Sequence, residues 1–299
     1  MFKHLLIPLD GSELAEAALP VARYLAGTLR AKVTLVHVIE EDAPNTVHGE
    51  RHLRSPAEAE AYLKEISRLA GPPGSEVAYH VHAAATGNVA QSIVEHQGEL
   101  APDLIVMCTH GRSGLRRIII GSIAQQVVAS GNIPVLLIRP ARCSRDESFA
   151  LKTVLAPLDG KPAHEQGLYV ALELSRATGA RLHLLSVAPT LATLAGRDAT
   201  MGKFMPGTTH AILELAETDL RTYLLKHLAT LQQAGVPAAA ELRCGDIAPT
   251  IAQVADKLDA DIIVLATHGK AGTEAFWTNS VGARVQAQTR RPLLLVPVK

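Results

Sequence analysis

The sequence has few aromatic residues and no excess of either charge. Phe, Trp and Tyr together make up 3% of its 299 residues, and Lys plus Arg equals Asp plus Glu at 29 each. A nucleic-acid-binding protein usually presents a basic surface and aromatic side chains on which bases stack. The composition therefore argues against a nucleic-acid partner.

Cysteine and long apolar runs are also scarce. The three cysteines, Cys108, Cys143 and Cys244, form no CxxC pair, which is typical of a protein from a reducing compartment. The apolar run Leu104–Cys108 is far shorter than the roughly 20 residues that a membrane helix needs. The opening MFKHLLIPLDGS turns polar before a signal-peptide core can form. We expect a cytoplasmic protein with no membrane partner.

Hydrophobic residues, in contrast, are plentiful at 47%, with 19% charged, so the chain can bury a sizeable core. The sequence also repeats itself. HLLIPLDGS begins at His4 and TVLAPLDGK begins at Thr153, an offset of 149 residues. DLIVMCTHGRSG begins at Asp103 and DIIVLATHGKAG begins at Asp261, an offset of 158 residues. Two copies of one structural unit are therefore expected.

A polar segment at 140–150, PARCSRDESFA, separates the two copies and has the composition of a linker. We therefore expect one domain at 1–142 and a second at 151–299. In each copy, short apolar runs alternate with helical patterns, which predicts right-handed crossovers and a parallel sheet. Near-continuous hydrophobic strands indicate a sheet covered on both faces. The predicted fold class is α/β, doubly wound, with two tandem parallel-sheet domains.

The elements expected in the first copy follow from this pattern. The predicted strands are Leu5–Leu9, Val33–Val38, Val77–His82, Leu104–Cys108 and Val135–Ile138. Capping residues such as Ser and Asn come before the predicted helices, which cover Glu13–Leu29, Pro56–Leu69, Val89–Gly98 and Ile123–Ser130.

Polar, glycine-containing segments follow the first and fourth predicted strands, at 8–12 and 109–114. In sheets of this kind, ligands bind beyond the carboxyl ends of the strands, where the strand order reverses. Glycines let backbone N–H groups approach an anion, and Gly121-Ser122 opens a helix whose start attracts negative charge. Arg112, Arg116 and Arg117 add three positive charges. A phosphate site is predicted here, although an ordinary loop with a capped helix is the alternative.

These motifs resemble those of the universal stress protein family, and the resemblance covers nearly the whole chain, once in each copy. ATP-binding members share the pattern G-x2-G-x9-G-[ST]. In this sequence it falls on Cys108, Gly111, Gly121 and Ser122, with a cysteine in place of the first glycine. The family fold is a five-stranded parallel sheet with strand order 3-2-1-4-5, similar to that of the adenine nucleotide alpha hydrolases.

The resemblance implies ATP, with or without Mg²⁺, as the ligand of the first domain. Carried over by position, the nucleotide-binding residues are Pro8, Leu9, Asp10, Val38, Met107, Thr109, Gly111, Arg112, Gly121, Ser122 and Ile123. An acid at the start of a helix, favoured there by the helix dipole, is the alternative role for Asp10.

The second copy departs from the pattern at its phosphate end. The motif falls on Ala266, Gly269, Asn279 and Ser280, so two glycines are lost. The intervening nine residues carry one lysine and one glutamate instead of three arginines. A weaker second site is expected at Pro157, Asp159, Val187, Thr267, Gly269 and Ser280.

The expected function is that of a non-enzymatic, ATP-binding regulator of a stress response, with the nucleotide held mainly by the first domain. One alternative is a slow ATPase or phosphotransferase, for which the sequence offers no obvious base. Another is an interaction module without a ligand. No catalytic residue and no metal ligand are predicted. The resemblance also implies that Val135–Ile138 pairs with Leu293–Val296 within the chain, and that the protein forms a homodimer.

Overall fold

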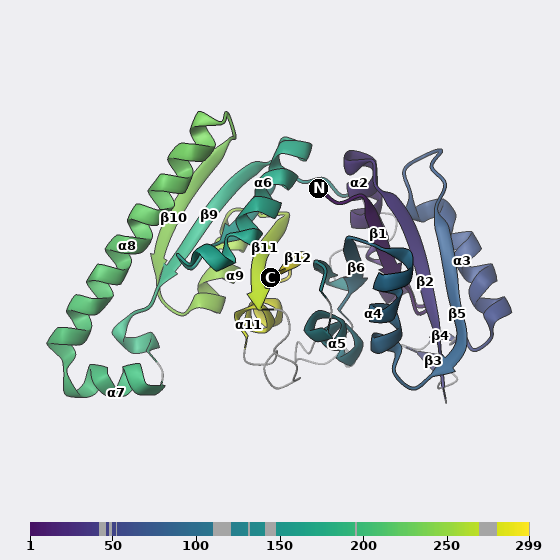
Figure 1. Ribbon diagram of the computed structural model, residues 1–299, viewed down its shortest axis with the longest axis horizontal. Helices are drawn as coiled ribbons and strands as arrows, with labels where there is room; N and C mark the ends of the chain where they lie inside the picture. The colour runs from purple at the N-terminus through teal and green to yellow at the C-terminus, as the bar shows by residue number, and fades with distance from the viewer. Residues whose placement is uncertain are drawn as a thin grey trace.

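The computed structural model describes residues 1–41, 46–47, 50–51, 53–109, 121–130, 132–140, 148–194, 196–268 and 280–298. Among these residues, ten strands form one sheet in the order β10-β9-β8-β11-β12-β7-β6-β1-β2-β5 (Figure 1). The two halves of the chain lie at opposite ends of the longest axis, and both termini lie near the middle. The predicted site residues Gly111, Arg112 and Gly269 lie outside the described residues.

Each half of the chain contributes five strands. The first half provides β1 (His4–Pro8), β2 (Lys32–Glu40), β5 (Ala78–Thr86), β6 (Leu104–Cys108) and β7 (Val135–Ile138). The second provides β8 (Thr153–Pro157), β9 (Arg181–Ala188), β10 (Ala238–Cys244), β11 (Ile262–His268) and β12 (Leu293–Val298). Counted within either half, the order is 3-2-1-4-5 with parallel neighbours, which confirms the predicted fold class. A separate hairpin joins β3 (Thr46–Val47) and β4 (Glu50–Arg51).

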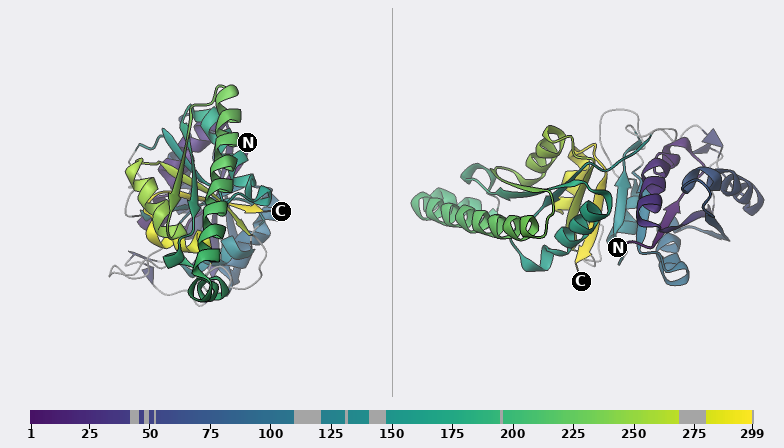
Figure 2. Two further views of the ribbon diagram at one scale, coloured as in Figure 1. Left: turned by 90° about the vertical axis from the view of Figure 1, so that its left-hand side faces the viewer. Right: turned by 90° about the horizontal axis from the view of Figure 1, so that it is seen from above.

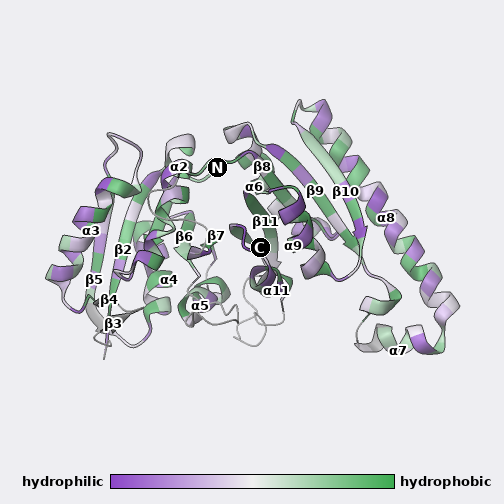
Figure 3. Cartoon of the chain, turned by 180° about the vertical axis from the view of Figure 1, so that it is seen from behind, coloured by the Kyte–Doolittle hydropathy of each residue, from purple (hydrophilic) through white to green (hydrophobic). Residues whose placement is uncertain are grey.

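Helices cover both faces of the sheet (Figure 2). One face packs against α2 (Leu19–Leu29), α3 (Pro56–Ala70), α6 (Gln166–Thr178) and α8 (Pro206–Gln233). The other packs against α4 (Val89–Leu100), α5 (Ser122–Ser130), α9 (Ile247–Lys257) and α11 (Val281–Gln288). A further helix, α7 (Gly196–Phe204), precedes α8. Figure 3 shows the apolar residues concentrated on the strands between these layers.

The predicted helix over Glu13–Leu29 is instead two helices. A short α1 (Glu13–Glu16) begins after Ser12, whose side chain accepts a hydrogen bond from the Ala15 amide. The chain then restarts as α2, with Pro20 in its first turn. Proline has no N–H to donate and its ring clashes inside a helix, but it fits well in a first turn. Pro20 therefore explains why one continuous helix does not form.

An aspartate in front of the fourth strand ties it to the first strand in both halves. The Asp103 carboxylate accepts hydrogen bonds from the Lys3 and His4 amides, at 2.7 and 2.9 Å. The Asp261 carboxylate accepts equivalent bonds from the Lys152 and Thr153 amides, at 2.7 and 2.8 Å. The repeated aspartate thus provides acceptors for backbone N–H groups where the first strand of each half begins.

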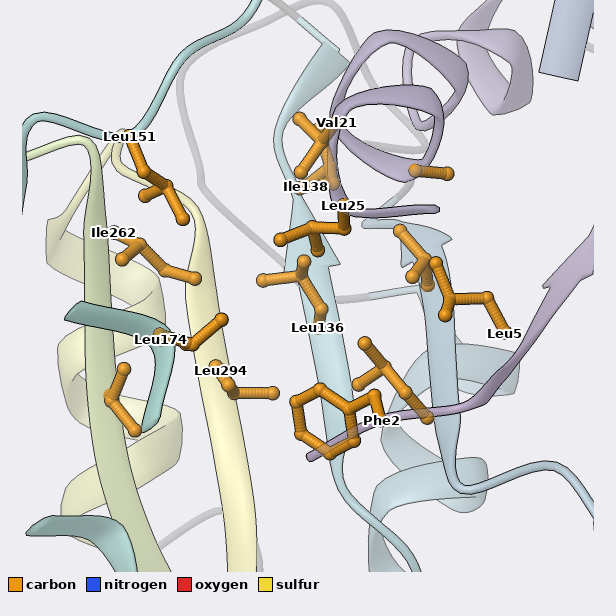
Figure 4. Close-up of a cluster of buried hydrophobic side chains, with 14 of the residues drawn as sticks. Phe2, Leu5, Val21, Leu25, Leu136, Ile138, Leu151, Leu174, Ile262 and Leu294 are labelled. Carbon is orange, nitrogen blue, oxygen red and sulfur yellow. The ribbon is translucent and has the colours of Figure 1, made fainter. Parts of the chain in front are cut away.

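The two halves join through an antiparallel pair, β7 with β12, which confirms the predicted pairing of the last strands. Leu137 lies opposite Leu293, and Leu136 lies opposite Leu294. Because side chains alternate between the faces of a strand, this pair supplies both apolar layers. Leu136 and Leu294 join the cluster on one face, shown in Figure 4, while Leu137 and Leu293 join the cluster on the other. Each apolar layer therefore runs continuously across both halves.

The junction should be a main source of stability. Leu294 is 1% exposed, so Leu294→Ala leaves a cavity between the halves and should lower the free energy of unfolding by about 2–5 kcal/mol. The matched control is Leu215→Ala on α8, where the side chain is 63% exposed and the expected change is within about 0.5 kcal/mol. Urea denaturation of both variants measures the difference. Equal midpoints for the two would contradict the assignment of the junction.

Candidate functional site

A cavity lies at the carboxyl ends of the strands in each half. The cavity of the second half has a volume of about 410 Å³ and is lined by Pro157, Leu158, Asp159, Lys161, His164, Leu185, Val187, Ile247, Ile251, Leu265, Ala266, Thr267, Ser280, Val281 and Gly282. The cavity of the first half has a volume of about 110 Å³ and is lined by Pro8, Leu9, Asp10, Ala15, Val36, His37, Val38, Glu40, Val89, Ile93, Met107 and Ile123.

The two cavities occupy equivalent positions in the two copies. Asp10 and Asp159 are related by the offset of 149 residues, as are Val38 and Val187. Other lining residues follow the offset of 158 residues: Val89 with Ile247, Ile93 with Ile251, Met107 with Leu265 and Ile123 with Val281. In each half the first strand lies between the second and the fourth, so the cavity is at the point where the strand order reverses.

The structure gathers many of the predicted first-half residues around its cavity, namely Pro8, Leu9, Asp10, Val38, Met107 and Ile123. Thr109 has another position: its side chain is buried, and its hydroxyl donates to the Ile138 carbonyl at 3.2 Å. Thr109 therefore ties the end of β6 to β7. Gly121 and Ser122 lie at the start of α5 and are not among the residues lining the cavity.

In the second half, the cavity contacts Pro157, Asp159, Val187, Thr267 and Ser280, all of them predicted. Ser280 is the N-cap of α11, and its hydroxyl accepts a hydrogen bond from the Ala283 amide at 3.1 Å. Val281 and Gly282 in the first turn also line the cavity. The start of a helix, where backbone N–H groups lack carbonyl partners within the helix, therefore borders this space.

The turn after the first strand is built in the same way in both halves. Gly11 and Gly160 have positive φ values of 89° and 79°, a conformation that residues with a Cβ rarely adopt. In front of Gly11, the Asp10 carboxylate accepts hydrogen bonds from the Ser12 amide at 3.0 Å and the Ser12 hydroxyl at 2.6 Å. The repeated glycine thus lets the chain turn sharply and leaves the aspartate at the cavity wall.

The acid of the second half has a different environment from that of the first. Its partner is His164, which closes the turn η2 (Pro162–His164) and places Nδ1 2.6 Å from the Asp159 carboxylate. The ammonium of Lys161 lies 3.8 Å from the same carboxylate. In the first half the position equivalent to His164 is Ala15. The second cavity therefore carries a lysine and a histidine near its acid, and the phosphate motif does not reveal either of them.

Cys108, which replaces the first motif glycine, does not fill the first cavity. Its side chain is buried, and Sγ donates to the Ala15 carbonyl at 3.5 Å. It belongs to the apolar cluster on the α2 face, whereas its neighbour Met107 lines the cavity on the opposite face. The cysteine is thus accommodated by packing against a helix.

Several cavity residues were missed by sequence reasoning. These are Ala15, Val36, His37, Glu40, Val89 and Ile93 in the first half, and Leu158, Lys161, His164, Leu185, Ile247, Ile251, Leu265, Val281 and Gly282 in the second. A signal was available for one pair: Val89 and Ile93 are four residues apart at the start of a predicted helix, and so share a face. The helix preceded by Gly87-Asn88 follows the third strand, and its contribution to the cavity depends on packing.

Close helix–strand contact at the second cavity leads to a stability prediction. A Cβ added at Gly167 on α6 would lie 2.9 Å from the backbone nitrogen of Ala266, which cannot move without shifting β11. Gly167→Ala should therefore lower the stability by about 1–3 kcal/mol. Gly207→Ala on α8, where a Cβ meets nothing within 4 Å, should leave it unchanged or raise it by up to about 1 kcal/mol. Thermal unfolding compares the two, and a stable Gly167→Ala variant would refute the close contact.

No helix in the part of the chain that the structure describes is both long and apolar enough to cross a membrane.

Comparison with known proteins gives consistent matches. The model of the Universal stress protein family matches residues 1–139 and again residues 150–297. Universal stress protein MJ0531 of Methanocaldococcus jannaschii is 30% identical over 145 residues, covering 46% of this chain and 83% of that protein. A universal stress protein of Thermus aquaticus is 35% identical over 143 residues, covering 46% of this chain and 100% of that protein. Each of these relatives thus corresponds to one half of the chain.

Solved structures match the whole chain. A crystal structure of a protein from Pseudomonas aeruginosa UCBPP-PA14 has a TM-score of 0.69 at 16% identity, covering 99% of this chain and 93% of that one. A universal stress protein from Archaeoglobus fulgidus DSM 4304 has a TM-score of 0.61 at 13% identity, covering 99% and 96%. At these identities the likeness concerns the fold. Since the family model accounts for both halves, the chain belongs to the universal stress protein family and carries two of its domains in tandem.

Proposed function

We propose that this protein is an ATP-binding regulator of a stress response, and that the first domain holds most of the bound nucleotide. Members of the family commonly bind adenine nucleotides. The observation that carries the proposal is the phosphate motif of the first domain, with Gly111, Gly121 and Ser122 at the family spacing. The cavity lined by Asp10, Val38 and Met107 supports a nucleoside position in the same domain.

The distribution of charge supports the preference for the first domain. The nine residues between Gly111 and Gly121 contain three arginines, whereas the equivalent residues of the second domain contain Lys270 and Glu274. A hydrogen bond between a cation and a phosphate contributes about 1.5–3 kcal/mol. Losing two such contacts and adding a repelling carboxylate would weaken triphosphate binding by orders of magnitude.

For the second domain we propose a smaller ligand, a nucleoside such as adenosine. Its cavity of about 410 Å³ lies within the range of roughly 300–1,000 Å³ that is common for small-molecule sites. The wall is mainly apolar, with Val187, Ile251 and Leu265, and it carries one carboxylate, Asp159. A carboxylate accepts hydrogen bonds from sugar hydroxyls. Asn279 in place of the last glycine leaves less room for a phosphate.

Binding without turnover is the proposed mode of action, in a protein that also forms a homodimer. ATP would stabilise one conformation of the first domain and so change the affinity for a partner. Two histidines line the cavities, and both have structural contacts: His37 Nδ1 lies 2.8 Å from the Leu9 carbonyl, and His164 contacts Asp159. A slow ATPase is the competing function, and steady-state phosphate release that follows site variants would favour it.

The proposal predicts unequal effects of matched substitutions at the two phosphate ends. Gly121→Val should lower ATP affinity at least tenfold, because the added side chain takes the space where the phosphate and the backbone meet. Asn279→Val, at the equivalent position, should change the affinity less than twofold. Equilibrium dialysis with labelled ATP and Mg²⁺ measures both. Equal affinities for the two variants, or no binding by the unmodified chain, would refute ATP binding in the first domain.

The second-domain ligand makes its own prediction. Asp159→Ala should weaken adenosine binding at least tenfold and leave ATP binding unchanged, since the carboxylate borders only the second cavity. Asp10→Ala is the matched variant of the first domain and should weaken ATP binding without affecting adenosine at the second site. Calorimetric titration with each ligand distinguishes the two sites. If Asp10→Ala removes all adenosine binding, the second-domain proposal is wrong.

A further inference from the structure

Three histidines lie together on the first half, away from the residues that line its cavity. His80 and His82 are two residues apart on β5, so their side chains share one face of the strand. His96 on α4 packs against that face, with ring centroids 4.8 Å from His80 and 5.2 Å from His82. One ligand nitrogen from each of the three lies within 4.8 Å of the others. A strand and a helix thus bring three imidazoles to one point.

The position of His96 is unusual because one of its ring nitrogens lacks a hydrogen-bond partner. The residue is 1% exposed, and its Nδ1 lies 2.6 Å from the Ser92 carbonyl. A carbonyl accepts only, so Nδ1 carries the proton and Nε2 presents a lone pair. That Nε2 is buried and has no hydrogen-bond partner. The carboxylate of Glu99 is 3.8 Å away, beyond hydrogen-bonding distance.

A buried polar atom without a partner needs an explanation, because its lost hydrogen bond to water is not replaced. Neutral imidazoles with lone pairs are the form in which histidine binds metals.

We propose that His80, His82 and His96 form a Zn²⁺ site that links β5 to α4. Three histidines with a fourth, open position are a common zinc ligand set. The fourth ligand is water or the exposed carboxylate of Glu99, one turn after His96 on α4. The hydrogen bond from His96 Nδ1 to the Ser92 carbonyl fixes the orientation of the ring, as the outer partners of metal-bound histidines generally do.

Zinc binding at this cluster requires only small movements of the three histidine side chains. Tetrahedral zinc with bonds of about 2.0–2.1 Å holds its ligand nitrogens about 3.4 Å apart. The three nitrogens, which lie within 4.8 Å of one another, must therefore approach by up to about 1.4 Å. His80 and His82 are only half-buried, and β5 is the last strand of the sheet at this end. Rotation of their side chains is thus less restricted than that of His96, which stays fixed by Ser92 and provides the anchor.

The site also has a consequence for the adjacent cavity. α4 begins with Val89 and Ile93, which line the first cavity, and His96 follows Ile93 by one turn. A metal bond from His96 to the edge strand would hold this helix in place. The site is independent of the proposed nucleotide function, because none of its three histidines lines the cavity.

Calorimetric titration of the full chain, stripped of metal with a chelator, with zinc chloride provides the test. We expect one Zn²⁺ per chain, and a rise in the midpoint of thermal unfolding when zinc is added. The double variant His80→Asn, His82→Asn changes the half-buried ligands and keeps the buried anchor, so it should fold, as circular dichroism verifies. It should bind zinc at least tenfold more weakly and show no thermal shift.

The matched control is His210→Asn on α8, where an exposed histidine lies 3.2 Å from Glu214 outside the cluster. It should bind zinc as the unmodified chain does. The proposal is overturned if the unmodified chain binds no stoichiometric zinc, or if the double variant binds it equally well, because the metal would then lie elsewhere. Binding of Cu²⁺ or Ni²⁺ without Zn²⁺ would also refute zinc as the ligand.

Discussion

The pairing of β7 with β12 is the interaction on which the rest of the molecule depends. It joins two sheets that would each end in an exposed row of backbone donors and acceptors flanked by leucines. Because the paired residues alternate between the faces, one set of hydrogen bonds also makes the two apolar layers continuous across the halves. Arg139 strengthens the junction, since its guanidinium donates to the Gln286 carbonyl at 2.9 Å. The halves therefore form one core on each face of the sheet.

Within each half, different strands form the junction and the cavity. The last strand is committed to the junction, while the first, second and fourth strands border the cavity. The copies have diverged in their motif residues and in the residues that line their cavities. The sequence of the first half keeps two motif glycines and three arginines, and its cavity has a volume of about 110 Å³. The second half has lost two motif glycines, and its cavity of about 410 Å³ has Lys161 and His164 near its acid. The two domains are thus related in fold and differ in the size and the lining of their cavities.

The sequence was sufficient to predict features that depend on local pattern and on repetition. The strands, their order and the junction follow from apolar runs, the duplicated motifs and the family resemblance. The sequence pattern did not predict the break between α1 and α2, because the apolar residues keep a helical spacing on both sides of it. The break is marked only by Pro20, which lies in the first turn of α2. His164 was missed because it belongs to no recognised motif. Only the short turn after Asp159 brings it next to the carboxylate. The three-histidine cluster combines a strand and the helix that packs on it, so its geometry depends on how α4 rests on β5.

The antiparallel junction also affects the synthesis of the chain. β7 ends at Ile138 and β12 begins at Leu293, so roughly 150 residues separate the two partners. At about 5–20 residues per second, the first half waits roughly 8–30 s on the ribosome before its partner strand is made. During that interval its apolar edge is open to pairing with the same edge of another nascent chain. Covalent linkage of the two copies sets a limit on this risk, because the correct partner arrives tethered and at a high local concentration.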